Sequence, residues 1–278
     1  MRDQALIDRL SETARQLRLD VVKMLHQAGS GHTGGSLSAA DIMAALFFEH
    51  MNLNPQDPER SGRDWFVLSK GHAAPIYYAA LAQRGLLDPA ETAKLRRTGC
   101  ALQGHPDCKL TPGVDVSTGS LGQGLSVALG MALGARLDFP QARVFVLLGD
   151  GELQEGQIWE AAMAAAHYRT ANLTAVVDNN GLQIDGPVSQ VMSIEPLADK
   201  WRAFGWAVRE IDGHDLTQIL DGLAWADAVS DRPAVLVAKT IKGKGVSIFE
   251  GQVKYHGVSP TDEEFETCLL ELEAGREC

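Results

Sequence analysis

Apolar residues recur at steps of three and four along the first stretch of the chain, Ala5–Ala28. The apolar positions include Leu6, Leu10 and Leu17, and Gly29 follows the stretch directly. This spacing places the apolar side chains on one face of a helix, and a glycine after the last periodic position is a common helix end. The pattern therefore predicts an amphipathic helix that ends at Gly29.

The same spacing, together with the turn residues between periodic stretches, predicts further helices. They are expected at 38–50, 75–84, a stretch after the glycine-rich segment 117–124 that ends near 137, 154–169, 216–229 and 261–272. Ser38 followed by Asp41 resembles a capping box at a helix start. Gly130 and Gly134 share one face of their expected helix, where they would permit close packing of another helix.

Short apolar runs lie between these helices and predict strands. They are Trp65–Leu68, Arg143–Leu148, Leu173–Asp178, Trp206–Ile211 and Ala234–Lys239. Runs that are apolar on both faces and joined by helices are typical of a parallel sheet covered on both sides. The sequence thus predicts an α/β fold of three layers, with a central, mostly parallel sheet flanked by helices.

Composition fits one large soluble domain. The chain has 278 residues, of which 45% are hydrophobic and 22% charged. It contains no apolar run of about 18 residues, and its N-terminal segment lacks the continuous apolar core of a signal peptide. We therefore expect no membrane span and a cytoplasmic location.

Charge and cysteine content exclude two classes of site. The formal net charge is −11, which argues against a nucleic-acid-binding face, and an anionic ligand would need a locally positive site. Cys100, Cys108, Cys268 and Cys278 have no CxxC spacing. Neither a structural zinc site nor a disulfide framework is expected.

Polar residues follow two neighbouring strands of the predicted sheet. Asp150 lies between two glycines after the first strand, and Asn180 follows the second strand, 30 residues further on. One βαβ crossover has this length, so both side chains should lie at the same edge of the sheet. Oxygen ligands of this kind suit Mg²⁺, although two ordinary Gly/Asp/Asn turns would give the same letters.

Two glycine-rich segments are expected to be loops that approach a ligand closely. Four glycines occur within Gly29–Ser38, too many for a helix interior. The segment STGSLGQG at 117–124 is the second.

These motifs occur together in an order that resembles the transketolase family. The matching segments, found between about residues 10 and 257, are GSGHTGGSLS, FVLSKGHAAPIYYA, GHPD, STGSLGQGLSVALGMALG, GDGELQEGQIWEA, DNNGLQIDG and IDGHD. The resemblance implies a thiamine-diphosphate-binding fold. It also implies Mg²⁺-dependent transfer of a two-carbon ketol unit between sugar phosphates, as in the pentose phosphate pathway.

The resemblance assigns ligands by position. Asp150, Asn180 and the carbonyl of Leu182 would bind Mg²⁺, and Gly151 and Asn180 would touch the diphosphate. Further cofactor contacts would come from the backbone of Gly119, Ser120 and Leu121, where many family members have proline in place of the serine.

Histidines would carry the proton transfers. By resemblance, His32 and His105 face the substrate hydroxyls, whereas His72 and His256 lie near the diphosphate, and His256 can also contact substrate. An imidazole with a pKa near 6.5 can both accept and return a proton. Taken without the resemblance, a histidine in a loop is more often a structural group, and His214 receives no role.

Two other pairs of charged residues remain open to two interpretations. Glu155 matches a family position that supports cofactor activation at the subunit interface, while Glu155 and Glu160 together could be a solvated helix face. Lys242 and Lys244 are either a charged loop or a positive cover over the phosphates, and are left unassigned.

The glutamate that activates the cofactor in the family belongs to a second, pyrimidine-binding domain, and no matching segment occurs in this sequence. We therefore expect 1–278 to be a single diphosphate-side domain with 258–278 as a C-terminal tail or helix. A C-terminal transketolase subunit would supply the other half in a heterotetramer of two chains of each kind. The alternatives are a deoxyxylulose-phosphate synthase, a 2-oxoacid dehydrogenase α chain or a non-catalytic regulatory subunit.

Overall fold

A computed structural model describes residues 2–57 and 61–275. Its centre is a parallel sheet of β1 (Trp65–Leu68), β2 (Val144–Gly149), β3 (Leu173–Asn179), β6 (Ala207–Asp212) and β7 (Ala234–Lys239). The strand order is β1-β2-β3-β7-β6, and every pairing is parallel. A small antiparallel pair, β4 (Leu182–Gln183) and β5 (Gly186–Pro187), lies outside it.

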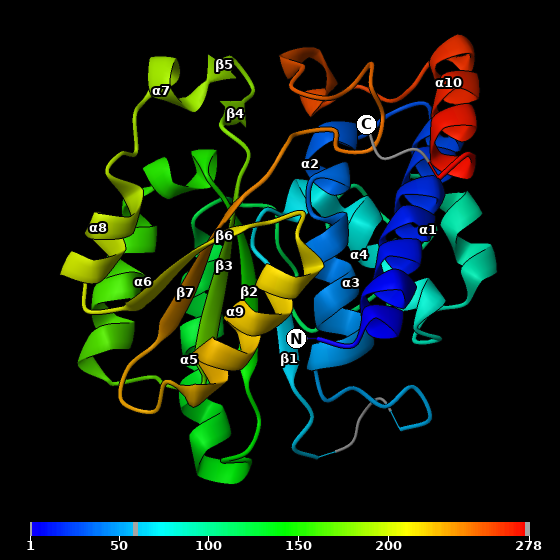
Figure 1. Ribbon diagram of the computed structural model, residues 1–278. Coiled ribbons are helices and arrows are strands. Elements are labelled where there is room, and N and C mark those ends of the chain that lie inside the picture. Colours follow the sequence, from blue (N-terminus) through cyan, green and yellow to red (C-terminus); the bar gives the residue numbers. More distant parts are fainter. Residues whose placement is uncertain (1, 58–60, 276–278) are drawn as a thin grey trace.

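Helices cover both faces of the sheet (Figure 1). One layer holds α5 (Gln123–Asp138), α6 (Gly156–His167) and α8 (Leu197–Ala203). The other holds α1 (Gln4–Ala28), α3 (Ala40–Ala45), α4 (Ala74–Gln83) and α9 (Leu216–Ala228), with α10 (Asp262–Glu273) packed on α1. Short helices complete the chain: α2 (Thr33–Leu37), η1 (Leu46–His50), η2 (Gly71–Ala73), η3 (Pro89–Lys94), η4 (Gly151–Gln154), α7 (Val188–Val191) and η5 (Val253–His256).

The strands bury alternate side chains in two separate cores. In β2, Phe145 and Leu147 join the core under α1, α3 and α4, whereas Val144, Val146 and Leu148 join the core under α5 and α6. Because successive side chains of a strand point to opposite faces, burial on both faces requires a continuous apolar run. The predicted three-layer α/β architecture is confirmed.

The first glycine-rich loop is partly helical, so its prediction is wrong for Thr33–Leu37, which forms α2. The glycines here serve close packing. A Cβ on Gly34 would lie 2.8 Å from Cγ of Lys242 and 3.1 Å from the carbonyl oxygen of Tyr255. Tertiary contact therefore overrides the low helix propensity of glycine.

The predicted capping box at Ser38 and Asp41 is also wrong. The next helix, α3, begins at Ala40 without a side-chain cap. The Ser38 hydroxyl instead donates to the Asp178 carboxylate at 2.6 Å, and the Asp41 carboxylate accepts from Arg18. Both side chains serve long-range contacts that a local pattern cannot reveal.

Two further helix expectations need correction. The helix expected over 154–169 begins at Gly156, because Glu155 has extended backbone angles. No atom lies within 4 Å of a Cβ placed on Gly130 or Gly134, so within the described residues these glycines pack against no other helix.

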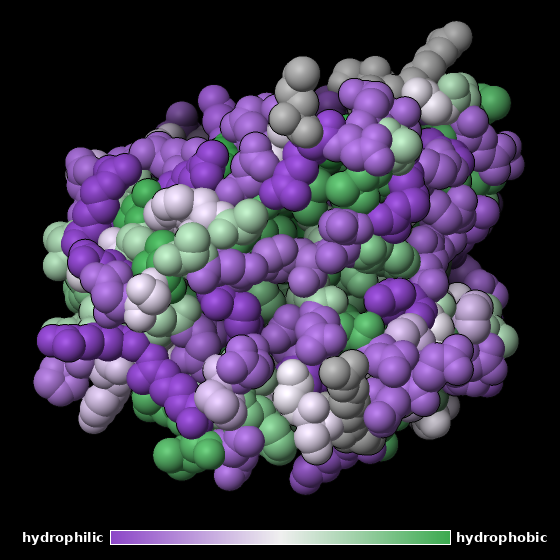
Figure 2. All heavy atoms as spheres, turned by 60° about the horizontal axis from the view of Figure 1, so that its bottom comes forward, coloured by the Kyte–Doolittle hydropathy of each residue, from purple (hydrophilic) through white to green (hydrophobic). Residues whose placement is uncertain are grey.

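The end of the molecule that carries the amino ends of the strands is mainly polar, with smaller apolar groups between the polar ones (Figure 2). Among the described residues, no helix combines the length and the apolar content needed to cross a membrane. Cys278 lies outside the described residues, and the other three cysteines are free.

Candidate functional site

The carboxyl ends of β2 and β3 bring Asp150 and Asn180 together, as their spacing predicts. Gly149 pairs with Asp178 in the sheet register, so Asp150 and Asn180 leave the sheet on adjacent strands. The Asp150 carboxylate accepts from the backbone N–H of Gly151 at 2.7 Å and from that of Gly181. The first predicted ligand is thereby tied to the loop that carries the second.

Leu182 lies in the same loop. Its N–H donates to Oδ1 of Asn180 at 3.1 Å, and its carbonyl oxygen accepts from Nζ of Lys242 at 3.1 Å. The three predicted metal ligands therefore belong to one hydrogen-bonded unit. No group of three or more His, Cys, Asp or Glu in 2–57 and 61–275 could hold a metal ion, so a cation here would need amide and carbonyl oxygens besides the Asp150 carboxylate.

The electrostatics of Asp150 favour a cation. Only 3% of the residue is exposed. Burial and the nearby Asp178 carboxylate raise the pKa of Asp150 to about 6, although the N–H groups of Gly181 and Gly151 and the Lys242 ammonium oppose the rise. A buried carboxylate in this state is stabilised by an added positive charge.

Beneath these loops, Asp178 and Lys70 form a buried ion pair, with exposures of 0% and 1%. The Lys70 ammonium also donates to the carbonyl oxygen of Gly35 at 2.6 Å, and the hydroxyls of Ser38 and Thr240 donate to Asp178. Burial works to raise the pKa of Asp178, but Lys70 and the two hydroxyls outweigh it and lower the pKa. Segments from four parts of the chain meet at this carboxylate.

Glu152, which sequence reasoning did not single out, ties the second glycine-rich loop to the sheet. Its carboxylate accepts from the N–H groups of Gly122 and Gly149 at 3.0 Å each and from the Ser69 hydroxyl. Burial raises the pKa of Glu152, and these donors oppose the rise. The Glu152 carboxylate therefore connects the second glycine-rich loop to the turn after β1 and to the end of β2.

The second glycine-rich loop lies against the histidines. Gly119 has a φ of +141°, and a Cβ there would lie 2.8 Å from Cδ2 of His105. Leu121 lines the cavity described below, while Ser120 is exposed beside it. A Cβ on Gly71 would lie 2.7 Å from the backbone nitrogen of Gly119, so both glycines are required for the close approach.

The four histidines assigned by resemblance form a cluster. Ring centroids of His32 lie 5.1 Å from His72, 5.7 Å from His256 and 6.4 Å from His105. His72 and His256 are stacked at 5.2 Å. Four histidines that are far apart in the sequence, between positions 32 and 256, therefore lie close together in the fold.

The cluster is held in the neutral form. Burial, followed by the positive charge of neighbouring groups, lowers the pKa of His32 to about 4 and of His256 to about 3. The pKa values of His72 and His105 are also lowered, with burial as the main cause. Nδ1 of His32 is buried and has no hydrogen-bond partner in the described part of the chain, which leaves it able to bind a ligand hydroxyl.

Lys242, left unassigned from the sequence, belongs to the site. Its side chain is 2% exposed, and its ammonium contacts Nδ1 of His256 at 3.0 Å as well as the Leu182 carbonyl. Burial and the Lys70 charge lower the pKa of Lys242 to about 8. The glycines of KGKG are the sequence feature that could have indicated this burial, because Gly243 has a φ of +81° and packs closely against the backbone of Phe249.

A cavity of about 190 Å³ opens between these groups. Its lining includes Asp150, Gly151, Asn180, Leu182, Leu121, Glu155, Lys242, His72 and His256. Glu155 is exposed at the rim, directly before α6, and Glu160 is exposed within that helix. The predicted metal ligands and two of the histidines thus share one space.

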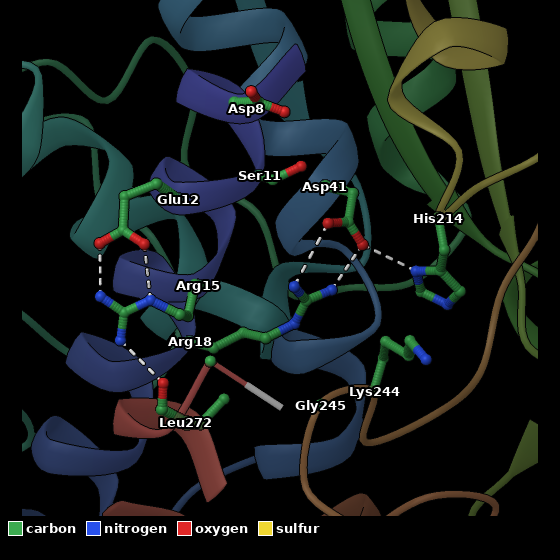
Figure 3. Close-up of a pocket in the computed structure, with 11 residues that line it drawn as sticks. Asp8, Ser11, Glu12, Arg15, Arg18, Asp41, His214, Lys244, Gly245 and Leu272 are labelled. Carbon is green, nitrogen blue, oxygen red and sulfur yellow. Dashed lines mark hydrogen bonds and ion pairs between the residues drawn. The ribbon is translucent and has the colours of Figure 1, made fainter. Parts of the chain in front are cut away.

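A larger cavity, of about 520 Å³, lies elsewhere, between α1, α3 and α10 (Figure 3). In it Asp41 accepts from Arg18 and from Nδ1 of His214 at 2.7 Å. Nε2 of His214 accepts from the N–H of Ile241 at 2.9 Å, so this histidine anchors the loop that carries Lys242. Lys244 lines this second cavity and not the first.

Comparison with known proteins identifies relatives over nearly the whole chain. Residues 8–272 match the family described as transketolase, thiamine diphosphate binding domain. A 6-deoxy-6-sulfo-D-fructose transketolase subunit from a Clostridium species is 43% identical, with 95% of this chain and 96% of that protein covered. An apulose-4-phosphate transketolase subunit from Phocaeicola vulgatus is 40% identical, covering 96% and 94%.

Solved structures agree with the sequence relatives. The crystal structure of a transketolase from Campylobacter jejuni superposes with a TM-score of 0.89 at 32% identity. The match covers 98% of this chain and 43% of that one. The chain therefore spans less than half of this longer protein, but nearly all of the two subunits.

Proposed function

The chain belongs to the transketolase family, and on that premise we propose that it binds thiamine diphosphate and Mg²⁺ and acts in transfer of a two-carbon ketol unit from a ketose phosphate to an aldose phosphate. The observation that carries the proposal is the shared cavity. The oxygens of Asp150, Asn180 and Leu182 lie there beside the half-buried His72 and His256. The family match supports the thiamine diphosphate part, since it concerns the domain that binds this cofactor.

The residues present fit a bound cation. Mg²⁺ takes six oxygens, and the Asp150 carboxylate, the Asn180 amide oxygen and the Leu182 carbonyl offer three. The raised pKa of Asp150 indicates that this carboxylate lacks full charge compensation within the chain. Diphosphate oxygens and a water would complete the set, and Gly151 and Asn180 would touch the diphosphate.

Groups around the cavity fit the rest of the cofactor. Lys242, His72 and His256, which line the cavity, would lie near the diphosphate. The backbone of Gly119, Ser120 and Leu121 would line the cofactor. When bound, thiamine diphosphate supplies the electron sink for cleavage of the C–C bond.

The histidines of this chain would move the protons. His32 and His105 would accept hydrogen bonds from substrate hydroxyls, because their lowered pKa values keep the imidazoles neutral at pH 7. Nδ1 of His32 has no protein partner among the described residues and is available for this contact. His256, with access to the cavity, would hold either a phosphate oxygen or a substrate hydroxyl.

A partner subunit would complete the site. Two relatives of this chain are named transketolase subunits, which supports an assembly of two kinds of chain. Ile184, which lines the cavity, is 67% exposed, and Met192, whose carbonyl oxygen accepts from Gln154 of the same lining, is 61% exposed. A second protein surface would cover these apolar side chains. We propose that residues 1–278 form the diphosphate-side domain, that Glu155 meets a C-terminal subunit carrying the pyrimidine-binding domain, and that the assembly is a heterotetramer of two chains of each kind.

Cofactor binding tests the site directly. Calorimetric titration of thiamine diphosphate into the assembled chains should show binding with Mg²⁺ and much weaker binding with excess chelator. Asp150→Asn should weaken binding at least about 10- to 100-fold, the loss seen even for outer-shell partners of metal ligands. Asp199→Asn, on the exposed face of α8, is the matched control. Unchanged binding in the Asp150 variant would contradict the proposal.

Activity tests the reaction. The assembled chains should transfer a ketol unit from a ketose phosphate to an aldose phosphate, and a His32→Gln variant should lose most of this rate. Decarboxylation of pyruvate without ketol transfer would indicate a different thiamine diphosphate enzyme. Absence of cofactor binding in either assembly state would indicate a regulatory subunit.

A further inference from the structure

Arg96 adopts a backbone conformation that non-glycine residues rarely take. Its φ is +61°, in the left-handed region. Leu95 and Leu102, at 2% and 0% exposure, anchor the segment in the core on either side, and the Arg96 N–H donates to the Leu102 carbonyl oxygen at 2.8 Å. Such conformations cost free energy and are retained where the surrounding structure needs them.

The left-handed turn directs the Arg96 side chain towards the substrate histidines. A Cβ on Gly104 would lie 2.7 Å from both Cζ and Nη2 of Arg96, and a Cβ on Gly31 would lie 3.6 Å from its Nε. These glycines directly precede His105 and His32. The guanidinium therefore packs against both histidine loops, in a space that only a residue without a side chain leaves open at Gly104.

Arg96 is half-buried, and no carboxylate of residues 2–57 and 61–275 forms an ion pair with its guanidinium. The titratable groups that act on His32 are Arg96, His105 and Lys242, with His72 and His256 in ring contact. Arg96 is the charged group that acts on His105. The charge of Arg96 thus acts on both histidines.

We propose that Arg96 is a positioning residue for the ketol transfer: its guanidinium holds the loops of His32 and His105 together, and its positive charge favours the neutral, proton-accepting form of both imidazoles. The inference rests on the proposed function. It goes beyond that function by naming a residue outside the lining of the cavity. The uncharged imidazole is the form able to accept a hydroxyl proton.

The sign of the effect follows from the charge. A positive neighbour disfavours protonation of an imidazole, so removal of Arg96 raises the pKa of both histidines. Activity that needs the neutral form is then lost at a higher pH. We expect the acid limb of the kcat/KM profile to move up by about one pH unit, which is about tenfold in rate below that limb.

The test is a pH profile of kcat/KM for ketol transfer between pH 3.5 and 8, with the assembled chains, because the pKa of His32 is lowered to about 4. Arg96→Gln should move the acid limb upward, Arg96→Lys should largely restore it, and Arg97→Gln, at the exposed neighbouring position, should leave it unchanged. Histidine ring NMR on the same variants should show the matching rise in the pKa of His32 and His105. Thermal unfolding confirms that each variant is folded.

Gly104→Ala gives a second approach if Arg96→Gln does not fold. The added methyl group meets the flexible end of the Arg96 side chain, so the guanidinium can move away with little loss of stability. This variant should reproduce the shift of the acid limb. A uniform loss of activity at every pH, an unchanged profile, or an equal shift in Arg97→Gln would overturn the inference, whereas an inactive wild-type assembly would contradict the proposed function instead.

Discussion

Removal of the Lys70 ammonium tests whether the buried ion pair of Lys70 and Asp178 stabilises the fold beneath the site. In Lys70→Met the side chain keeps much of its length but loses its charge. The Asp178 carboxylate, fully buried, then has no cationic partner among its contacts in the described structure. The carbonyl oxygen of Gly35 also loses its donor.

The magnitude follows from what remains at Asp178. Breaking a buried pair by removing one partner costs about 3–5 kcal/mol, because an uncompensated charge stays behind. The Ser38 and Thr240 hydroxyls continue to donate to the carboxylate, so we expect the lower end, about 3 kcal/mol. For a chain of 278 residues, with an unfolding entropy of about 2.1 cal/mol/K per residue, that corresponds to a fall in melting temperature of about 5 °C.

Urea unfolding followed by circular dichroism measures the loss at pH 7. Lys239→Met is the matched control, because that lysine is exposed at the end of β7 and its replacement should change stability by less than about 0.5 kcal/mol. The loss should shrink as the pH falls. Without Lys70, burial raises the pKa of Asp178, and the folded chain can then take up a proton that neutralises the buried charge.

A double-mutant cycle with Asp178→Asn isolates the interaction. The double variant should be more stable than the sum of the single losses predicts, by at least about 1–2 kcal/mol, because the neutral amide needs no cation. A loss under about 1 kcal/mol in Lys70→Met, or additive losses in the cycle, would refute the reasoning that the pair compensates a buried charge.

Three further expectations follow. Gly71→Ala places a Cβ 2.7 Å from the backbone nitrogen of Gly119, so it should lower stability by about 1–3 kcal/mol in urea unfolding and weaken cofactor binding in calorimetry. Because burial lowers the pKa of His32 to about 4, the folded chain binds fewer protons than the unfolded chain between about pH 6.5 and 4; the wild type should therefore lose more stability than His32→Gln as pH falls through this window. Glu155→Gln should reduce ketol transfer by the assembled chains at least about tenfold, the lower part of the range for a lost hydrogen bond to a charged group, while Glu160→Gln, exposed within α6, should retain the wild-type rate.

The fold could be predicted because β1, β2, β3 and β7 are buried on both faces. A run such as Val144–Gly149 has no polar side to confuse with a surface strand, and the helices α4, α6 and α9 follow β1, β2 and β6. The meeting of Asp150 and Asn180 followed from the same logic, since one crossover separates them. These inferences needed only periodicity and chain length.

Other parts of the site depend on contacts that local sequence does not encode. Ser38 and Asp41 match a helix-start pattern, yet both side chains are used by partners more than 20 positions away in the sequence. Lys242 looks like an exposed charge in KGKG but is buried against His256 and Leu182. Only the folded chain shows which polar residues pair at a distance.

The local charge of the site resolves a conflict that composition raises. The chain has a net charge of −11, but the groups beside the cavity and the histidines include Lys70, Lys242 and Arg96. Lys70 compensates Asp178, whereas the pKa of Lys242 is lowered to about 8, a sign that its own charge is incompletely compensated within the chain. A bound anion would supply that compensation, as a bound cation would for Asp150. The Asp150 carboxylate and the Lys242 ammonium, two incompletely compensated charges of opposite sign, line the same cavity. This arrangement is expected for a ligand that brings a diphosphate and its metal together.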